Sequence, residues 1–482
     1  MNSNYNSIKL SKTQKKLPLA NNFSFHSSYN PEKEAETFAS QFSNEELFFV
    51  VGGIAGGFHL KSLIENNKNR KIIAVENSIE DIEYLKQLEI VKNLFYKNQI
   101  IFCTPENLVN AILENYIPQV YGKLTLTFLR SWKEFFYENS KKIEIITQTA
   151  LKNIKNDYSV QTRFAKTWNF NFFNNLKQTS KQIDFNSLLK INFKNKKAAI
   201  IAAGPTLDYS IKELKKDTEK YTIFCVDTTF PVLLKHSIIP DFCISLDGQN
   251  ASVNHFHNLK NFPKKTIFAL DLTANLSITQ KLAELSLPFF FFESGHPLCR
   301  IASNFEGGKS FPSLKSGLGT VTCAALSLAK LLGFEEFTCF GADFSYNFGK
   351  PYCKGTYLDD LYSIKQNILS NTETEFSRLL FRTELFKQKN NFTTELLMNY
   401  KKSFEELKIS EIKKETKINK FNSEKFLKML KEKLFQLNEN PIENLSFPFF
   451  YSLLPLMAFY EQDFSIKESF ELARKKTLLY TE

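Results

Sequence analysis

The sequence predicts an α/β protein with a central Rossmann-like parallel sheet, a smaller Rossmann-like domain before it and a helical region after it. Short apolar runs of strand length alternate with helix-compatible stretches, which is typical of a parallel sheet covered by helices on both faces. The chain has 482 residues, too many for one hydrophobic core. We therefore expect more than one domain.

The composition indicates a cytoplasmic protein. Seven cysteines lie mostly in apolar segments and lack CxxC spacing, as reduced structural thiols do. No window reaches the roughly 18 to 20 apolar residues of a membrane span, and the first residues lack the apolar core of a signal peptide. The net charge is +11, but the lysines are spread along the chain. We therefore expect no nucleic-acid partner.

Residues 1–30 are polar and without periodicity, so we expect a flexible tail. A first Rossmann-like domain is predicted over 31–143. There "LFFVV" meets a glycine-rich turn, and the next strand ends at Glu76, about 20 residues on. This pattern is typical of a nucleoside site in which Glu76 accepts hydrogen bonds from a ribose. Such turns also occur in domains that bind nothing, so both interpretations stay open.

A helical linker is predicted over 144–190, the central domain over 191–360 and a helical region bracing it over 361–482. Six strands are expected in the central domain, in "AAIIAA", "YTIFCVD", "DFCISLD", "KTIFALD", "PFFFFE" and "FTCFGAD". Four of these runs end in aspartate: Asp227, Asp247, Asp271 and Asp343. Ligands of open α/β sheets bind beyond the carboxyl ends of the strands, so polar chemistry should gather there.

Two small-residue turns open helices in this domain. The first is Gly204-Pro205-Thr206, whose backbone amides and threonine hydroxyl we expect to be free to meet an anion. The second turn contains Ser316, Gly317, Gly319 and Thr320, ahead of an apolar helix. Two such turns in one sheet predict a nucleotide on one side and its attached group on the other.

Four segments together resemble the motility-associated factor (Maf) family of bacterial glycosyltransferases, implicated in flagellin glycosylation. They are "AAIIAAGPTLD", "CVDTT", "IPDFCISLDGQ" and "SGLGTVTCAALSLAKLLGFEEFTCFGADFSYNFGKPYCKGT", and the resemblance covers about residues 195–358. The family is placed near sialyltransferases that use CMP-sugars and shares a domain with archaeal hydroxymethyl-dihydropterin pyrophosphokinases.

The resemblance implies a CMP-activated nonulosonic acid, of pseudaminic or legionaminic type, as donor and flagellin as acceptor. It places Gly204, Pro205, Thr206 and Asp227 at the nucleotide, and Ser316 and Gly317 at the cytidine. Asp343 matches the end of the family's Gly-x-Asp-Phe strand. Tyr352 matches a tyrosine that steadies the departing phosphate, and Tyr346 lies one position from a second.

The sequence also departs from the sialyltransferases. Ala203 and Asp227 stand where they have asparagines, so contacts to the donor must differ. Their catalytic base is a histidine after these motifs, whereas this chain has no histidine after His296.

A general base is still needed for an acceptor hydroxyl. Asp247 is the first candidate, Asp343 the second, and His296 a third. Gln249 either contacts the donor sugar or lies at the surface. No metal site is assigned and no cofactor is required, although Asp227, Asp247 and Asp343 have the oxygen ligands that suit Mg²⁺ or Mn²⁺.

Two other functions remain open. One is a pyrophosphokinase that transfers from ATP to a pterin alcohol, which would need two magnesium-binding carboxylates and a cationic clamp. The other is a non-catalytic accessory protein that binds flagellin. The N-terminal domain, helical tail and length favour a protein acceptor over a small pterin.

Overall fold

The computed structural model describes residues 3–191, 197–257, 262–317, 319–366, 371–388, 391–412, 415 and 417–482. The chain divides into two compact units. The first comprises residues 1–163, 437–447 and 453–475, and the second comprises 164–436, 448–452 and 476–482. Helix α8 (Tyr137–Leu176) contributes residues to both.

The first unit is built on a four-stranded parallel sheet in the order β6-β5-β4-β7. Every residue of β4 is buried, because helices cover both faces of a central parallel strand. The strands are β4 (Phe48–Gly52), β5 (Lys71–Val75), β6 (Ile100–Cys103) and β7 (Leu124–Phe128). The helices that accompany them are α1 (Pro31–Ala39), α2 (Phe58–Asn66), α3 (Ile79–Leu85), α4 (Glu89–Phe95), α5 (Pro105–Asn115), α6 (Pro118–Tyr121) and α7 (Arg130–Phe135).

The prediction of a flexible tail over residues 1–30 is wrong. This segment forms a three-stranded antiparallel sheet, β1 (Tyr5–Leu10), β2 (Lys16–Ala20) and β3 (Phe23–Ser24). Leu17 packs with Ala35 and Phe58 in a small core. The hydroxyl of Ser3 donates to the buried Asp81 at 2.8 Å. Most of β1 is solvent-exposed, and Ser3, Asn4 and Tyr5 donate hydrogen bonds to buried carboxylates, so the segment shows no hydrophobic periodicity.

The second unit contains a six-stranded, all-parallel sheet in the order β12-β11-β10-β9-β8-β13. All six strands expected in the central domain are present. They are β8 (Lys197–Ile201), β9 (Tyr221–Val226), β10 (Phe242–Ser245), β11 (Ile267–Asp271), β12 (Phe289–Phe292) and β13 (Phe337–Phe340). The α/β class with parallel sheets is therefore confirmed.

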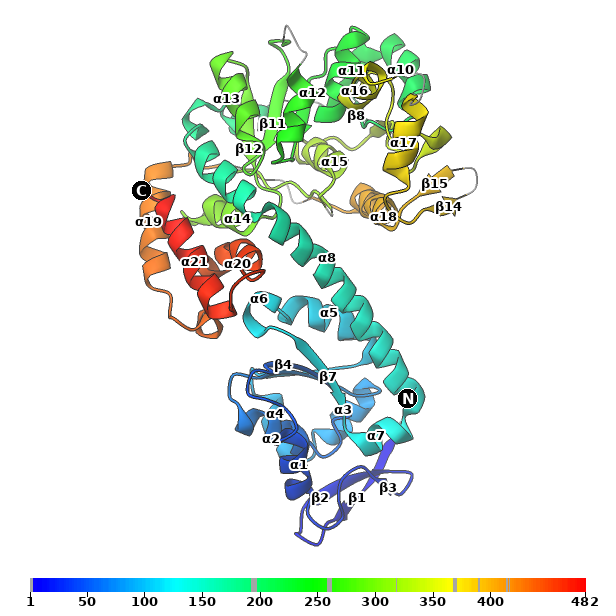
Figure 1. Cartoon of the computed structure of the whole chain (residues 1–482), viewed down its shortest axis with the longest axis vertical. Coiled ribbons are helices and arrows are strands. Elements are labelled where there is room, and N and C mark those ends of the chain that lie inside the picture. Colours follow the sequence, from blue (N-terminus) through cyan, green and yellow to red (C-terminus); the bar gives the residue numbers. More distant parts are fainter. Residues whose placement is uncertain are drawn as a thin grey trace. The chain divides into compact units, whose positions relative to one another are not determined.

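Helices cover both faces of this sheet (Figure 1). One face carries α10 (Leu207–Lys216), α11 (Phe230–Lys235), α12 (Asn254–His257) and α13 (Leu276–Glu284), and α15 (Val321–Leu331) lies on the other. Nine of the eleven residues of α15 are buried, because it packs between the sheet and α18 (Glu395–Ile409). A helix buried on all sides needs apolar residues all round, which explains its uniform composition.

The region 361–482 is mainly helical, as expected, but it is not one body. Residues 437–447 and 453–475, which include α20 and most of α21, belong to the first unit, whereas residues 361–436 belong to the second. A short hairpin, β14 (Phe386–Gln388) with β15 (Asn391–Thr393), was not foreseen. The remaining helices are α9 (Phe185–Leu189), α14 (Pro297–Asn304), α16 (Tyr357–Ile364), α17 (Thr372–Leu380), α19 (Ser423–Phe435), α20 (Leu454–Tyr460) and α21 (Ile466–Leu479).

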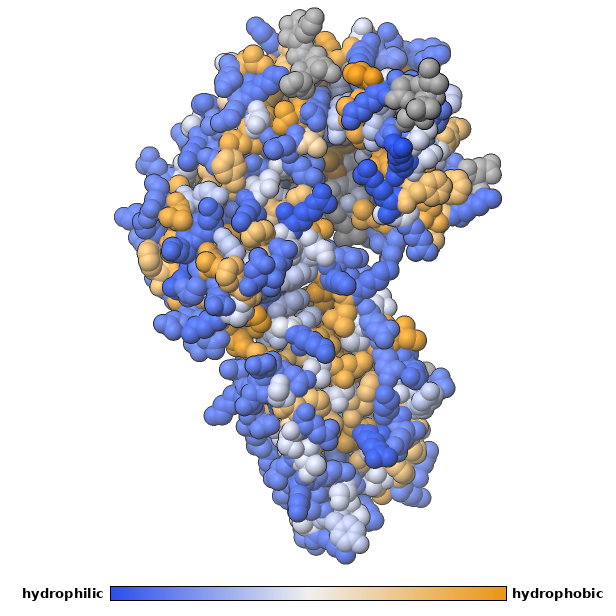
Figure 2. All heavy atoms as spheres, viewed as in Figure 1, coloured by the Kyte–Doolittle hydropathy of each residue, from blue (hydrophilic) through white to orange (hydrophobic). Residues whose placement is uncertain are grey.

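The face of the molecule in Figure 2 is mainly hydrophilic, with apolar residues scattered over it. Among the described residues, no helix combines the length and the apolar character that a membrane span requires.

Candidate functional site at the carboxyl ends of the strands

Strands β8 and β13 are neighbours at the point where the order of the strands in the sheet reverses: β9 to β12 follow on one side of β8, and β13 lies on its other side. Helix α10 follows β8 on one face and α15 precedes β13 on the other, and open α/β sheets bind ligands at such a switch point. Gly204 donates its N–H to the carbonyl of Gly341 at 2.8 Å. A Cβ atom at position 204 would lie 2.5 Å from a carboxylate oxygen of Asp343. The close approach of the two chain segments therefore requires a glycine.

Thr206 is bound to Asp343 across this switch point. Its N–H donates to one carboxylate oxygen at 2.9 Å and its hydroxyl donates to the other. The expectation that both donors are free for an anion is therefore not met. Asp343 holds the turn between β8 and α10, in which Pro205 is buried.

Asp227 and Asp247 follow the neighbouring strands β9 and β10. Asp227 is buried and accepts hydrogen bonds from the Ser245 hydroxyl and the Thr228 N–H, both at 2.7 Å. Asp247 is half-buried and accepts the N–H of Gln249 at 2.8 Å. Burial raises the pKa of Asp247, and the Asp227 carboxylate adds to this while Gln249 opposes it. A raised pKa makes this carboxylate a stronger base.

Tyrosines lie beside these two carboxylates. Burial raises the pKa of Tyr352 to about 12, and Tyr346, Tyr357 and Asp227 add to the increase. Its phenol therefore stays protonated at neutral pH and can donate a hydrogen bond. The Tyr352 side chain remains partly open, because 36% of its surface is exposed.

His255, on α12, belongs to the same cluster, and the sequence analysis missed it. Its ring packs edge-on against Tyr357 with centroids 5.0 Å apart, and Nε2 lies 3.5 Å from the Thr228 hydroxyl. Nδ1 is buried without a hydrogen-bond partner among the described residues. One signal in the sequence was available: Asp247 ends a predicted strand, and His255 follows it by eight residues in the segment beyond that strand end. We call Asp227, Asp247, His255, Tyr352 and Tyr357 the strand-end cluster.

The second small-residue turn opens α15, as expected. Thr320 is the residue before the helix, and its N–H returns to the carbonyl of Ser316 at 2.8 Å. Gly317 and Gly319 have φ angles of 60° and 91°, in the left-handed region that favours glycine. Apart from its chain neighbours, no atom of the residues that the structure describes lies within 4 Å of a Cβ placed on Gly319, so the turn has open space beside it.

Among the described residues, His296 makes no side-chain hydrogen bond to the strand-end cluster. It lies before α14, and its ring packs edge-on against Trp168 with centroids 5.6 Å apart. Burial lowers the pKa of His296 to about 4, so the ring is neutral at pH 7. Its two nitrogens are buried without partners among the described residues. Asp271, at the end of β11, accepts hydrogen bonds from Thr273 and Ser294.

Helix α8 holds the loops that follow β10 and β11. The Asn171 side chain donates to the carbonyls of Gly248 at 3.0 Å and Thr273 at 3.1 Å. The Asn175 side chain donates to the carbonyls of Leu272 at 3.0 Å and Ala274 at 2.9 Å. Gly248 follows Asp247 directly, so α8 fixes the position of the candidate base.

Within the described ranges, no three His, Cys, Asp or Glu side chains lie together as metal ligands would. The three aspartates considered for a cation have different protein partners: Asp227 binds Ser245, Asp247 binds Gln249 and Asp343 binds Thr206. The suggestion of Mg²⁺ or Mn²⁺ stays a prediction.

The glycine-rich turn of the first unit is filled by the protein's own side chains. Glu76 is fully buried and accepts hydrogen bonds from the Tyr5 hydroxyl at 3.1 Å, the Ile54 N–H at 3.0 Å and the Trp132 indole at 2.8 Å. A Cβ on Gly53 would lie 2.6 Å from Trp132. A ribose would have to displace Tyr5 and Trp132.

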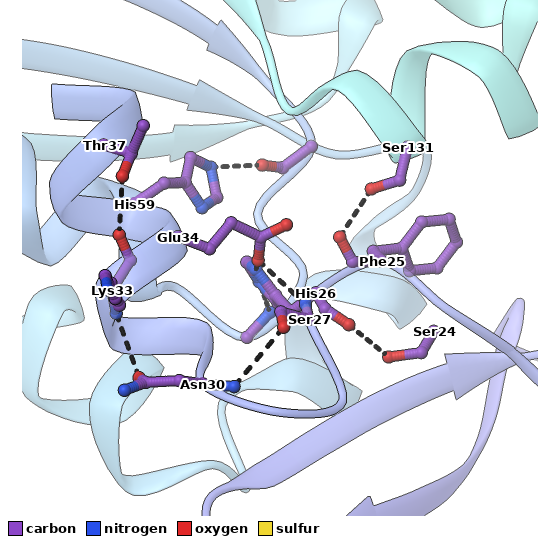
Figure 3. A network of polar contacts seen from close by, with 12 residues as sticks. Ser24, Phe25, His26, Ser27, Asn30, Lys33, Glu34, Thr37, His59 and Ser131 are labelled. Atoms are coloured by element: carbon purple, nitrogen blue, oxygen red, sulfur yellow. Dashed lines mark hydrogen bonds and ion pairs between the residues drawn. The ribbon is translucent and has the colours of Figure 1, made fainter. Parts of the chain in front are cut away.

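Two histidines satisfy the backbone of the same turn. His26 Nε2 accepts the N–H of Gly56 at 3.0 Å, which is the kind of donor that meets a phosphate in nucleotide-binding turns. His59 Nε2 lies 2.9 Å from the carbonyl of Gly53. Figure 3 shows His26 close to Glu34, whose carboxylate lies 3.6 Å from Nδ1 and accepts the Ser27 N–H. The site expected for a nucleoside is thus occupied from within.

Comparisons with known proteins agree with this architecture. A family model described as "6-hydroxymethylpterin diphosphokinase MptE-like" matches residues 170–349. Two uncharacterized proteins of Treponema pallidum (strain Nichols) are 38% identical over 141 residues and 35% identical over 156 residues. These matches span 29% and 31% of this chain, and 66% and 54% of the relatives' own length.

The structure of the Maf glycosyltransferase from Magnetospirillum magneticum AMB-1 is similar over 100% of this chain and 86% of that one, with a TM-score of 0.56 and 11% sequence identity. The fold is that of a Maf glycosyltransferase. The resemblance seen in the sequence is thereby confirmed for the architecture. The pterin-kinase family model falls on the sheet that carries the strand-end cluster, in agreement with the shared domain expected of Maf proteins.

Proposed function

We propose that this chain is a glycosyltransferase that moves a nonulosonic acid from its CMP-activated form to serine or threonine hydroxyls of flagellin. The observation that carries the proposal is the Maf glycosyltransferase fold shared over the whole chain. The strand-end cluster supports it, because it combines hydrogen-bond donors for a leaving phosphate with candidate bases for an acceptor hydroxyl. The activity would take place in the cytoplasm and support flagellar assembly and motility.

The nucleotide would bind between the two small-residue turns. The turn at Gly204 lies at the switch point of the sheet, and the turn with Ser316, Gly317, Gly319 and Thr320 directs the N-terminus of α15 towards the same edge. The first-turn amides of a helix favour a negatively charged group. Gln249, held by Asp247, would contact the donor sugar.

In the transfer, the bond from the anomeric carbon to the phosphate oxygen breaks and its electron pair leaves with CMP. The acceptor oxygen forms the new bond and gives up its proton. The neutral Tyr352 phenol, with Tyr346 near it, would donate to the phosphate as charge develops there. No metal ion is needed for this role, although Mg²⁺ or Mn²⁺ would assist it.

Asp247 is the first choice for the proton acceptor, and His255 is the group in the cluster that would share this role. Asp343 already accepts two hydrogen bonds from Thr206, so we assign it to holding the turn. His296 packs against Trp168, which is not part of the cluster, and is a weaker candidate for the proton acceptor than Asp247 or His255.

A second function is favoured by one observation, the pterin-kinase family model over residues 170–349. In that case the same strand ends would bind ATP and a pterin alcohol, and pyrophosphate would be transferred. This reaction needs bound Mg²⁺ and a cationic clamp.

Nucleotide binding separates the two functions. The transferase predicts that CMP raises the melting temperature of the protein and that ATP with Mg²⁺ does not, whereas the pyrophosphokinase predicts the reverse. The direct test incubates the protein with CMP-pseudaminic acid and flagellin and reads the flagellin mass. Asp247→Asn and His255→Gln should each lower kcat by about 10²- to 10⁴-fold. Flagellin that binds the protein but gains no mass would support the accessory-protein alternative.

A further inference from the structure

Two aromatic side chains beside the switch point are exposed to solvent. Tyr209 and Phe348 are 66% and 65% exposed, and their rings lie 5.5 Å apart at an angle of 58°. Tyr209 is in the first turn of α10, three residues after Thr206, and Phe348 follows Asp343 by five residues. Both aromatic residues therefore lie close in the chain to Thr206 and Asp343, whose hydrogen bonds join the ends of β8 and β13.

The backbone at Phe348 is strained. Its φ and ψ angles are 58° and 24°, a left-handed conformation that disfavours a bulky side chain. Phe344 has a similar φ of 49°, but its ring packs on Phe404 at 5.3 Å, and this packing offsets the strain. The ring of Phe348 lies largely in water beside Tyr209. A glycine would suit this backbone better, and an exposed phenyl ring adds little burial to offset the strain.

The loop that carries Phe348 is fixed on both sides. On one side, Tyr346 donates its N–H to the carbonyl of Phe392 at 2.7 Å. On the other, the N–H of Cys353 binds the carbonyl of Ala203 at 2.9 Å, and the N–H of Lys354 binds Asp208 at 2.8 Å. Asp208 is the neighbour of Tyr209, so one network positions both rings.

We propose that Tyr209 and Phe348 form an acceptor platform, which receives an apolar side chain of the protein acceptor next to the hydroxyl that is modified. The proposal rests on the proposed transferase function. A CMP-sugar offers phosphate, carboxylate and hydroxyl groups and one planar base, and the resemblance to the Maf family places that base at the turn with Ser316 and Gly317, whereas a protein segment offers apolar side chains. Exposed aromatic residues on a rigid frame are typical of the anchors of protein interfaces.

The test compares Phe348→Gly and Tyr209→Ala with Phe435→Ala. Phe435, at the end of α19, is also 65% exposed and serves as a matched control. Both platform variants should raise the KM for flagellin about tenfold, with a smaller change in kcat, because an interface anchor contributes about that much. Phe348→Gly should keep or raise the melting temperature. Phe435→Ala should leave KM unchanged.

Two results would overturn the proposal that Tyr209 and Phe348 bind the acceptor. One is an unchanged KM for flagellin in both variants while the wild type transfers the sugar. The other is a rise in the dissociation constant of CMP in both variants, since the rings would then stack on the cytosine. Failure of the wild-type protein to bind CMP or transfer any sugar is a different result, because it removes the proposed function itself.

Discussion

Gly204 allows β8 and β13 to approach closely because it has no Cβ atom. Its position leaves no room for a Cβ, since Asp343 and the Gly341 carbonyl would each lie 2.5 Å away. We predict that Gly204→Ala lowers the free energy of unfolding by about 1–3 kcal/mol, because one methyl group must displace the two segments. Urea denaturation measures this difference.

Asp343→Asn provides the companion variant. It keeps the size of the side chain, but an amide accepts through only one oxygen, so one of the two Thr206 donors loses its partner. The variant should be less stable than the wild type and bind CMP more weakly. Unchanged stability in both variants would mean that the turn relaxes without using these contacts.

The raised pKa of Glu76 should make the stability of the protein depend on pH. Burial raises its pKa to about 7, from an ordinary value near 4.5, while the surrounding donors oppose this. The folded state therefore binds more protons than the unfolded state between these values, so stability falls as the pH rises through them. From pH 6.5 to pH 8, we expect Glu76 to contribute a loss of about 1 kcal/mol to the free energy of unfolding.

The Glu76→Gln variant tests the origin of this slope. It should be less stable overall, because an amide cannot accept all the hydrogen bonds of a carboxylate, and it should lack the loss of about 1 kcal/mol that Glu76 contributes between pH 6.5 and pH 8. His59 and His296, whose pKa values burial lowers to about 3 and about 4, have the opposite effect and still add about 0.4 kcal/mol each between pH 6.5 and pH 8, but they do so equally in both proteins, so the difference between the two proteins isolates Glu76. An equal slope in both proteins would assign the dependence to other groups.

At the level of elements, α8 acts on the site through Asn171 and Asn175. Asn175→Ala would leave the buried carbonyls of Leu272 and Ala274 without these donors, and we expect a loss of about 2–4 kcal/mol in stability. Asn174→Ala is the control, because Asn174 is only partly buried and its side chain bonds the neighbouring turn of α8 and the exposed Lys177, so its effect should stay within about 0.5 kcal/mol. Equal effects of the two variants in urea denaturation would contradict the role given to Asn175.

The strands and helices of both parallel sheets were predictable because burial on two faces requires continuous apolar runs. All six strands of the central domain follow from this rule. The N-terminal sheet was not predictable by the same rule. Tyr5 is buried there among polar neighbours, and hydrogen bonds to Glu76 and Asp81 hold this end of the segment. Hydrogen-bond partners 70 or more residues away leave no local pattern.

For the whole molecule, the C-terminal residues should stabilise the N-terminal unit. Leu456, on α20, is fully buried, and Thr162 in α8 donates to the carbonyl of Ala458 at 3.2 Å. Leu456→Asp would place an unpaired charge in this core. We predict faster hydrogen exchange in β4, β5 and β7, read by mass spectrometry. Leu479→Asp is the control, because Leu479 is 55% exposed. Equal protection of the three strands in both variants would show that the first unit is stable without this packing.

The sequence by itself determined the α/β class, the positions of the strands along the chain, the glycine-rich turns and the placement of carboxylates at strand ends. These follow from periodicity and backbone conformation, which act over a few residues. Only the tertiary structure decided that Thr206 binds Asp343, that His255 joins Asp247 and Tyr357, and that Tyr5 and Trp132 enclose Glu76. Each of these depends on which segments meet in space, and a side chain's partners are fixed by packing across the whole chain.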